Sequence, residues 1–180
     1  MTWYDEYPWT SHADAMSDPS KLRTCFATID SECSETEFQR ALFYVDHASS
    51  DLGVPTSLAP PVVARLIASV LSLDGARRKL VLGEVEELTC GRYVETYTPA
   101  QVEWLLAARR ELVLAYHLWL RLAVTGDAQE ATECIDLVAY VGESFPDLRP
   151  RVLEFLHSCR ASRPDLAAEV DAVTAYLVDP

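Results

Sequence analysis

The sequence lacks the features of a membrane-bound or exported protein. No apolar run approaches the roughly 20 residues that a membrane-spanning helix needs, and Arg109, Arg110 and Arg121 interrupt the most apolar stretch. The first residues are acidic and aromatic, without the basic and apolar regions of a signal peptide. We therefore expect a cytoplasmic protein that makes no contact with a membrane.

The sequence also lacks the common motifs of catalysis and metal binding. It contains no GxSxG, Walker A, GxGxxG or HExxH pattern. The 5 cysteines form no CxxC pair, and their odd number and apolar surroundings favour reduced, buried thiols over disulfides or a metal site. The four histidines, His12, His47, His117 and His157, lack the spacing of metal ligands. We expect no metal and no cofactor.

Basic residues are scarce. The chain has 15 Lys and Arg against 28 Asp and Glu, a net charge of −13, and residues 1–51 carry ten of the acids against three bases. An acidic surface repels phosphate backbones, which argues against nucleic-acid binding. It would attract a basic partner and speed the encounter with it. The alternative is that the acidity only keeps the protein soluble.

Helical periodicity is the strongest pattern that is present, and residues 98–124 show it best. Thr98 is a candidate N-cap, Pro99 suits the first helical position, and Thr125-Gly126 is a stop signal. Apolar residues recur between these ends at spacings of three and four. The pattern predicts one continuous central helix of roughly 40 Å, covered on two sides by other helices.

Seven further helices are predicted from similar patterns. A capping box of Ser34 with Glu37 opens the second helix, and Asp127 with Glu130 opens the sixth. Residues 92–97 (RYVETY) are the one stretch with strand-like alternation and are predicted to be an extended connector, so no strand is expected. The seven helices are expected at 19–29, from 34 to 47 or 48, from 58 or 60 to 73, from about 76 to 90, from 127 to 142, after Phe145-Pro146-Asp147, and from about 164 almost to the C-terminus.

We expect a single domain over residues 1–180, because this length suits one hydrophobic core. Residues 1–17 form an aromatic N-terminal arm with Trp3, Tyr4, Tyr7 and Trp9, which docks either on the rest of the chain or on a partner. Residues 18–48 form an acidic first hairpin of helices. A loop rich in Ser, Gly and Pro follows at 49–61, and residues 58–180 form the repeat core.

The predicted helices pair into four hairpins with a period on the order of 40–50 residues, which is typical of an α-solenoid. The runs 54–91 and 110–158 resemble the bacterial HEAT-like repeat proteins of the ARM/HEAT superfamily. The shared features are a proline-containing loop, the apolar helix VVARLIASVL, an Asp-Gly turn and the pair Phe145-Pro146. The likeness covers about residues 40–160.

This resemblance implies an all-α fold, a right-handed α-α superhelix with a concave groove for a protein or peptide. Several small acidic bacterial members are thought to be immunity or accessory proteins of toxin and biosynthetic clusters. A second branch binds damaged DNA and excises alkylated bases with a strongly basic concave face, which this acidic chain lacks.

Aromatic and acidic residues around the central helix are the candidate binding site. Tyr93, Glu95 and Tyr97 would line one side of the extended connector. With Trp104 and Trp119 they could form a pocket for a cationic ligand, although packing of the same aromatics is the alternative. Glu103 and Glu111 would add negative charge, and His117 lies on the same helix.

His47 and His117 are the candidate acid–base residues. His47 follows Asp46 at a helix end before the Pro/Gly loop, which suits an acid–base pair, but a surface histidine is the alternative. His117 is a base or a hydrogen-bonded core residue. The basic run Arg77-Arg78-Lys79 opposes the dipole at the start of its helix, and we expect it to form a salt bridge within the chain.

Two functions remain open. In the first, the protein is a non-catalytic binding module whose acidic and aromatic groove holds a basic protein or peptide. In the second, it is a small helical enzyme or carrier with an aromatic pocket for a small organic molecule, with His47 or His117 as the acid–base group.

Overall fold

A computed structural model describes residues 7–12, 18–91 and 94–178, and the all-α fold class is confirmed. About 80% of the described residues are helical, and these residues contain nine α-helices and one pair of two-residue strands. The chain divides into two compact units, unit 1 (Met1–Ala108) and unit 2 (Arg109–Pro180). Within the described part of the chain, no helix has both the length and the apolar character to cross a membrane.

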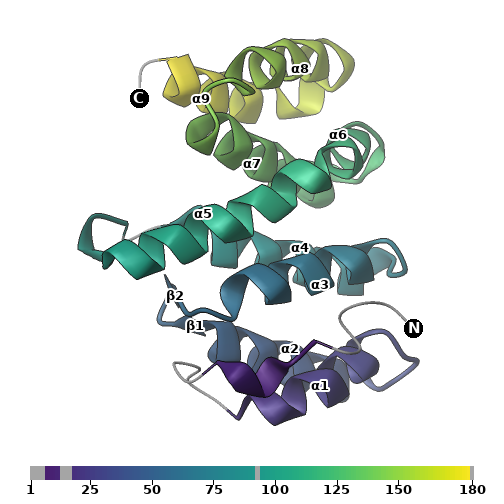
Figure 1. Ribbon diagram of the computed structural model, residues 1–180. Helices are drawn as coiled ribbons and strands as arrows, with labels where there is room; N and C mark the ends of the chain where they lie inside the picture. Colours follow the sequence, from purple (N-terminus) through teal and green to yellow (C-terminus); the bar gives the residue numbers. More distant parts are fainter. Residues whose placement is uncertain (1–6, 13–17, 92–93, 179–180) are drawn as a thin grey trace. The chain divides into compact units, whose positions relative to one another are not determined.

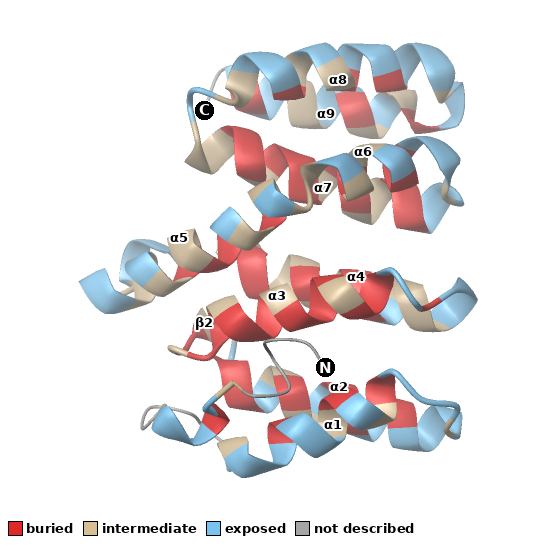
Figure 2. Cartoon of the chain, turned by 45° about the vertical axis from the view of Figure 1, so that its right-hand side comes forward, coloured by how far each residue is buried: buried red, intermediate tan, exposed pale blue. Residues whose placement is uncertain are grey.

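Unit 1 is built from two pairs of sequential helices (Figure 1). Helix α1 (Leu22–Ile29) packs on α2 (Glu35–Ser49), and α3 (Ala59–Val70) packs on α4 (Gly75–Cys90), while α2 also contacts α4. Helix α3 is buried over most of its length, as Figure 2 shows, because VVARLIASV offers apolar side chains on several faces.

Local start and stop signals in unit 1 act as the sequence predicts. The Asp18 carboxylate accepts a hydrogen bond from the Ser20 backbone at 3.0 Å and opens a 3₁₀ turn (Pro19–Lys21) that leads into α1. Ser34 and Glu37 form the complete capping box of α2. Gly91 ends α4 in the left-handed conformation, with φ of 68°. Each signal depends on neighbouring residues alone, which is why it could be read from sequence.

The loop after α2 contains a small β-hairpin that the sequence did not predict. Strands β1 (Ser50–Asp51) and β2 (Val54–Pro55) pair in antiparallel fashion. The two turn residues between them, Leu52 and Gly53, have φ of 53° and 82°, as a type I′ turn requires. Leucine is a rare choice for such a position, so the usual Asn-Gly signal was missing.

A buried arginine joins the end of α1 to α3. Arg65 forms an ion pair with Asp30 and donates to the Ser69 hydroxyl at 2.8 Å, and Ser69 in turn donates to Asp30 at 2.7 Å. The guanidinium also lies 5.1 Å from the centre of the Phe26 ring. Since every member has a partner, the charge of Arg65 is compensated inside unit 1.

The basic run at the start of α4 contacts its own chain through backbone carbonyls. Arg77 donates to the carbonyls of Ser31 and Cys33 in the loop between α1 and α2, with its guanidinium 5.0 Å from the centre of the Phe38 ring. Arg78 donates to the carbonyl of Leu73. The contacts lie within the chain as expected, but these two arginines bind carbonyl oxygens.

The described part of the aromatic arm packs on unit 1. Trp9 is 4% exposed and its ring centre lies 5.4 Å from that of Phe26. His12 bridges the Tyr7 hydroxyl at 3.0 Å and the Ser57 hydroxyl at 2.7 Å. Docking on the chain itself is thus confirmed for residues 7–12, whereas Trp3 and Tyr4 lie outside the described residues.

Unit 2 is also built from paired helices. Helix α6 (Tyr116–Thr125) packs on α7 (Ala128–Ser144), and α8 (Arg149–Ser162) packs on α9 (Ala167–Val178), while α7 contacts both α8 and α9. The capping box of Asp127 and Glu130 opens α7 as predicted. Gly142 does not end α7, because the helix continues to Ser144. A Cβ on Gly142 would lie only 3.2 Å from Val152, so glycine allows α8 to approach closely.

The prediction of one continuous helix over 98–124 is wrong. Helix α5 (Pro99–Leu114) ends before Ala115, which has φ of −97° and ψ of 11°, and α6 begins at Tyr116. The completely buried Trp119 donates its indole N–H to the Leu112 carbonyl at 3.0 Å. In a continuous helix that carbonyl would accept from the backbone of residue 116. The break raises the count from about eight helices to the nine found among the described residues.

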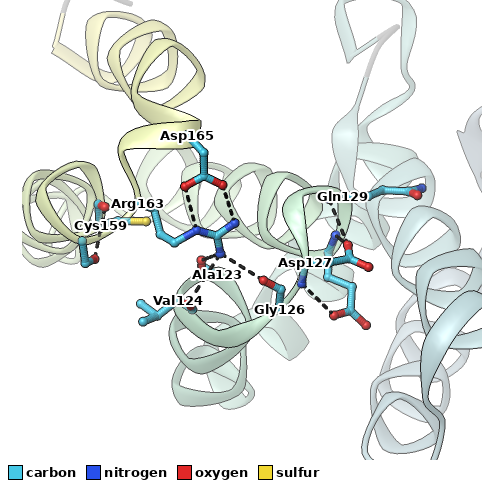
Figure 3. Close-up of polar contacts among 10 residues, drawn as sticks. Ala123, Val124, Gly126, Asp127, Gln129, Cys159, Arg163 and Asp165 are labelled. Carbon is cyan, nitrogen blue, oxygen red and sulfur yellow. Dashed lines mark hydrogen bonds and ion pairs between the residues drawn. The ribbon is translucent and has the colours of Figure 1, made fainter.

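An arginine stabilises the end of α6 (Figure 3). One terminal nitrogen of Arg163 donates to the carbonyls of Ala123 and Gly126 at 3.2 and 3.0 Å, and to that of Val124 at 3.4 Å. The other two guanidinium nitrogens form a bidentate ion pair with Asp165. A cation at this position complements the negative end of the helix dipole, and it links α6 to the turn before α9.

The described part of the connector before α5 is also not extended. Residues Val94–Thr96 form a 3₁₀ turn, while Arg92 and Tyr93 lie outside the described residues. Whether all residues form a single domain, and whether the helix pairs stack as a right-handed superhelix, stay predictions.

Candidate functional site

The predicted site residues fall into both units. Unit 1 holds Glu95, Tyr97, Glu103 and Trp104, unit 2 holds Glu111, His117 and Trp119, and Tyr93 lies outside the described residues. Trp119 is completely buried and its indole N–H is bound to a backbone carbonyl, which leaves no donor for a ligand. Glu111 is half-buried, and this burial raises the pKa of its carboxyl group.

Two of the predicted aromatic residues share a cleft in unit 1, here called the hairpin cleft. It has a volume of about 390 Å³ and lies between the β-hairpin and the segment that enters α5. The Tyr97 hydroxyl donates to the Gly53 carbonyl at 2.7 Å and so holds this segment against the hairpin turn. The lining residues are Asp51, Val54, Pro55, Thr56, Thr96, Tyr97, Thr98, Gln101 and Trp104.

Where α5 begins, at one wall of the hairpin cleft, Thr98 and Gln101 already use their polar groups in hydrogen bonds to each other. Gln101 accepts from the Thr98 backbone at 2.8 Å and from its hydroxyl at 3.0 Å, which caps the start of the helix. The first turn of α5 therefore offers little to an anion. The remaining charge on the lining belongs to the Asp51 carboxylate, so the cleft suits a cationic group better.

Exposed acidic and apolar residues adjoin the cleft lining in sequence. Glu95 precedes Thr96, and Glu103 precedes Trp104, and both glutamates are exposed. Leu52, which follows Asp51, is 88% exposed at the tip of the hairpin, and Val94 is 45% exposed. The surroundings of the hairpin cleft thus combine negative charge with two exposed apolar side chains.

A buried carboxyl group lies beside the predicted acid–base pair. Glu84 of α4 has a carboxylate oxygen that is shielded from solvent and has no hydrogen-bond partner among the described residues. Burial raises the pKa of Glu84 to about 8, and the charges of Asp46 and Glu87 add to the shift. Glu84 is buried because α2 packs against α4.

The structure does not pair His47 with Asp46. Asp46 accepts a hydrogen bond from the Ser50 hydroxyl at 2.7 Å, whereas the exposed His47 ring stacks on Phe43 with ring centres 4.8 Å apart. The charge of Asp46 is close enough to Glu84 to raise the pKa of the Glu84 carboxyl group. Among the described residues, no group of three His, Cys, Asp or Glu side chains has the geometry of a metal site.

His117 borders a pocket of unit 2. This pocket has a volume of about 280 Å³, and Tyr116, Arg151 and two apolar residues line the rest of it. The sequence indicated His117 but gave no sign of Arg151, because the two residues come together only when α8 packs against α6.

Comparisons with known proteins find no counterpart of this chain. No protein-family model matches it, and neither a curated protein nor a solved structure shows significant similarity to it.

Proposed function

We propose that this protein is a non-catalytic binding protein whose hairpin cleft holds a basic segment of a protein partner. The observation that carries the proposal is the composition of the cleft. The aromatic rings of Tyr97 and Trp104 and the carboxylate of Asp51 line the same cleft. Aromatic faces and carboxylates together are the groups that bind guanidinium and ammonium ions in proteins.

Charge complementarity favours a basic partner. Unit 1 carries sixteen acidic against eight basic residues, a net charge of −8. Glu95 and Glu103 are exposed and adjoin lining residues in sequence, so they would add long-range attraction for a positively charged segment. The guanidinium or ammonium group would lie against the aromatic rings, with Asp51 as its counter-ion.

Leu52 gives the proposed interface an apolar anchor. Its side chain is 88% exposed, and its backbone has φ of 53°, a conformation that favours glycine and asparagine. A leucine there contributes nothing to the core of unit 1 and strains the turn. Strain of this kind is retained where it has a function, and contact with a partner would supply one.

The resemblance to HEAT-like repeat proteins is part of the same proposal. It is supported by the packing of sequential helices as pairs in each unit, α1 with α2, α3 with α4, α6 with α7 and α8 with α9. A HEAT-like architecture would make this chain a cytoplasmic binding scaffold, and an immunity or accessory protein of a bacterial toxin or biosynthetic cluster is the role that we propose for it.

Selection from a random-peptide phage library tests the proposal. The wild-type protein is expected to enrich peptides that combine Arg or Lys with an apolar residue. Their affinity should fall at least about tenfold for Trp104→Ala, because one face of the cationic group loses its ring. Circular dichroism of the variant checks that the helical fold is retained.

Phe43→Ala is the matched control, since Phe43 is an aromatic residue 64% exposed on α2 outside the cleft lining. It should leave peptide affinity unchanged. Enrichment of no peptides, enrichment of acidic peptides, or equal binding by Trp104→Ala would each overturn the proposal.

A further inference from the structure

The pocket of unit 2 combines apolar walls with polar groups from two helices. Its volume is about 280 Å³ and its lining consists of Val113, Tyr116, His117, Leu148 and Arg151. Val113 and Leu148 supply the apolar walls, whereas Tyr116 and His117 begin α6 and Arg151 lies in the first turn of α8. A volume of this size is at the lower end for ligand pockets and suits a small molecule.

The polar groups of this pocket have no use within the fold. The Tyr116 hydroxyl is shielded from solvent and has no hydrogen-bond partner among the described residues. Over the same part of the chain, neither His117 nor Arg151 makes a hydrogen bond or an ion pair, although the rings of Tyr116 and His117 meet edge to face at 6.2 Å. Buried hydroxyl groups are rarely left unpaired, so the Tyr116 hydroxyl retains its capacity to donate to a ligand.

Charges on α8 lie near the Tyr116 hydroxyl. Burial is the largest effect on this group and raises the pKa of Tyr116, the positive charge of Arg151 opposes the rise, and the negative charge of Glu154 adds to it. Both α8 side chains are therefore close enough to act on the hydroxyl. Tyr116 stays a neutral hydrogen-bond donor at physiological pH, with a cation beside it.

The backbone adds positive potential at the same place. The pocket is lined by the first residues of α6 and by Leu148 and Arg151 at the start of α8, and the two helices contact each other. Their N-cap residues, Ala115 and Leu148, make no side-chain hydrogen bond to the first turn. The start of α8 therefore adds positive potential to the pocket, which favours an anion.

We infer that this pocket binds a small organic carboxylate. The guanidinium of Arg151 pairs with the carboxylate, and one carboxylate oxygen accepts from the Tyr116 hydroxyl, which the ligand uncovers as it binds. The apolar part of the ligand lies against Val113 and Leu148. This inference goes beyond the proposed peptide binding, and it does not depend on it, because all of the residues involved belong to unit 2.

Titration of the ¹⁵N-labelled protein with a panel of small molecules, followed by NMR, tests the inference. The panel contains straight-chain, branched and aromatic carboxylates, among them benzoate, each paired with its neutral amide. At least one carboxylate is expected to shift the backbone resonances of residues 116, 117 and 151, with its amide binding at least about tenfold more weakly. Arg151→Gln should weaken that carboxylate about tenfold or more, and Tyr116→Phe should weaken it several-fold.

Arg121→Gln is the control, because it removes the same charge from an exposed position of α6 outside the pocket. It should leave the affinity unchanged. The inference is overturned if no carboxylate of the panel shifts these resonances at millimolar concentration, if the amides bind as well as the carboxylates, or if Arg121→Gln and Arg151→Gln have equal effects.

Discussion

Glu84 shows how the surroundings of one residue can remove the negative charge that its type predicts. Its carboxyl group on α4 is buried, and the negative charges of Asp46 and Glu87 are nearby. Burial and these charges raise the pKa of Glu84 to about 8. The group is therefore mostly protonated at neutral pH, when a free glutamic acid would be ionised.

The raised pKa of Glu84 makes stability depend on pH. The folded protein keeps the proton up to about pH 8, whereas the unfolded chain loses it near the usual pKa of 4.5. The folded state binds more protons over this range, so the free energy of unfolding contributed by Glu84 falls as pH rises from about 4.5 to 8 and is level above that. Glu84→Gln should remove this fall. The free energy of unfolding of the variant, compared with that of the wild type, should therefore be higher at pH 9 than at pH 5 by an amount on the order of a few kcal/mol.

Urea unfolding at several pH values measures the effect of Glu84→Gln. Glu32→Gln, a substitution of an exposed acid in the loop after α1, should keep the pH dependence of the wild type. A Glu84→Gln variant that lost stability with pH as steeply as the wild type would show that Glu84 is ionised in the folded protein.

Leu52 tests whether strain in the hairpin turn serves binding. Leu52→Asn places a residue suited to positive φ at an 88% exposed position, and we expect the free energy of unfolding to rise by about 1 kcal/mol. The same variant should bind the selected basic peptides more weakly, because the apolar anchor is gone.

Leu71→Asn is the comparison for Leu52→Asn, since Leu71 is 71% exposed but has an ordinary φ of −67°. It should show neither gain in stability nor loss of affinity. Thermal unfolding and peptide titration measure the two effects, and equal affinity of Leu52→Asn and wild type would remove Leu52 from the interface.

At the scale of elements, Arg163 links α6 to the turn before α9. Its guanidinium donates to three carbonyls at the end of α6, and its side chain is only 15% exposed. Arg163→Ala would leave these carbonyls without their donor, at a cost of about 2 kcal/mol. Hydrogen exchange should show that the last turn of α6 opens more readily in the variant.

Arg160→Ala provides the matched change on α8. Arg160 forms an ion pair with Asp171, and both side chains are more than half exposed, so its loss should have no measurable effect on stability. If the two alanine variants unfolded at the same temperature, the carbonyl contacts of Arg163 would not stabilise α6.

The elements also show which parts of the fold could be predicted from sequence. The capping boxes of α2 and α7 depend on residues within a few positions, so sequence reasoning found them. At the break at Ala115, the indole of Trp119 bonds instead to a backbone carbonyl of α5. Periodicity contains no information about such a bond, and the central helix was therefore predicted too long.

The candidate sites follow the same rule. Tyr97 and Trp104 were predicted as neighbours because they lie close in sequence, and they do line one cleft. Arg151 and the buried state of Glu84 were missed, because each depends on contacts between helices, α8 with α6 and α4 with α2. In the sequence, Arg151 and Glu84 look like ordinary charged residues on the solvent-exposed face of a helix.

At the scale of the whole molecule, charge is the property that the proposed function uses. The chain has a net charge of −13, and such a charge raises the encounter rate with a basic partner while salt screens it. Replacing Asp51, Glu95 and Glu103 together by their amides changes the net charge to −10 and leaves the aromatic rings in place.

The salt dependence of peptide binding tests the central claim most directly. The affinity of the best selected peptide would be measured by fluorescence anisotropy at several salt concentrations, for the wild type and for the variant with Asp51→Asn, Glu95→Gln and Glu103→Gln. We predict that wild-type affinity falls about tenfold or more between about 0.05 and 0.5 M NaCl, and that the variant binds weakly with little dependence on salt. Wild-type binding that is insensitive to salt, or a variant that binds as tightly as the wild type, would contradict an acidic cleft for a basic segment.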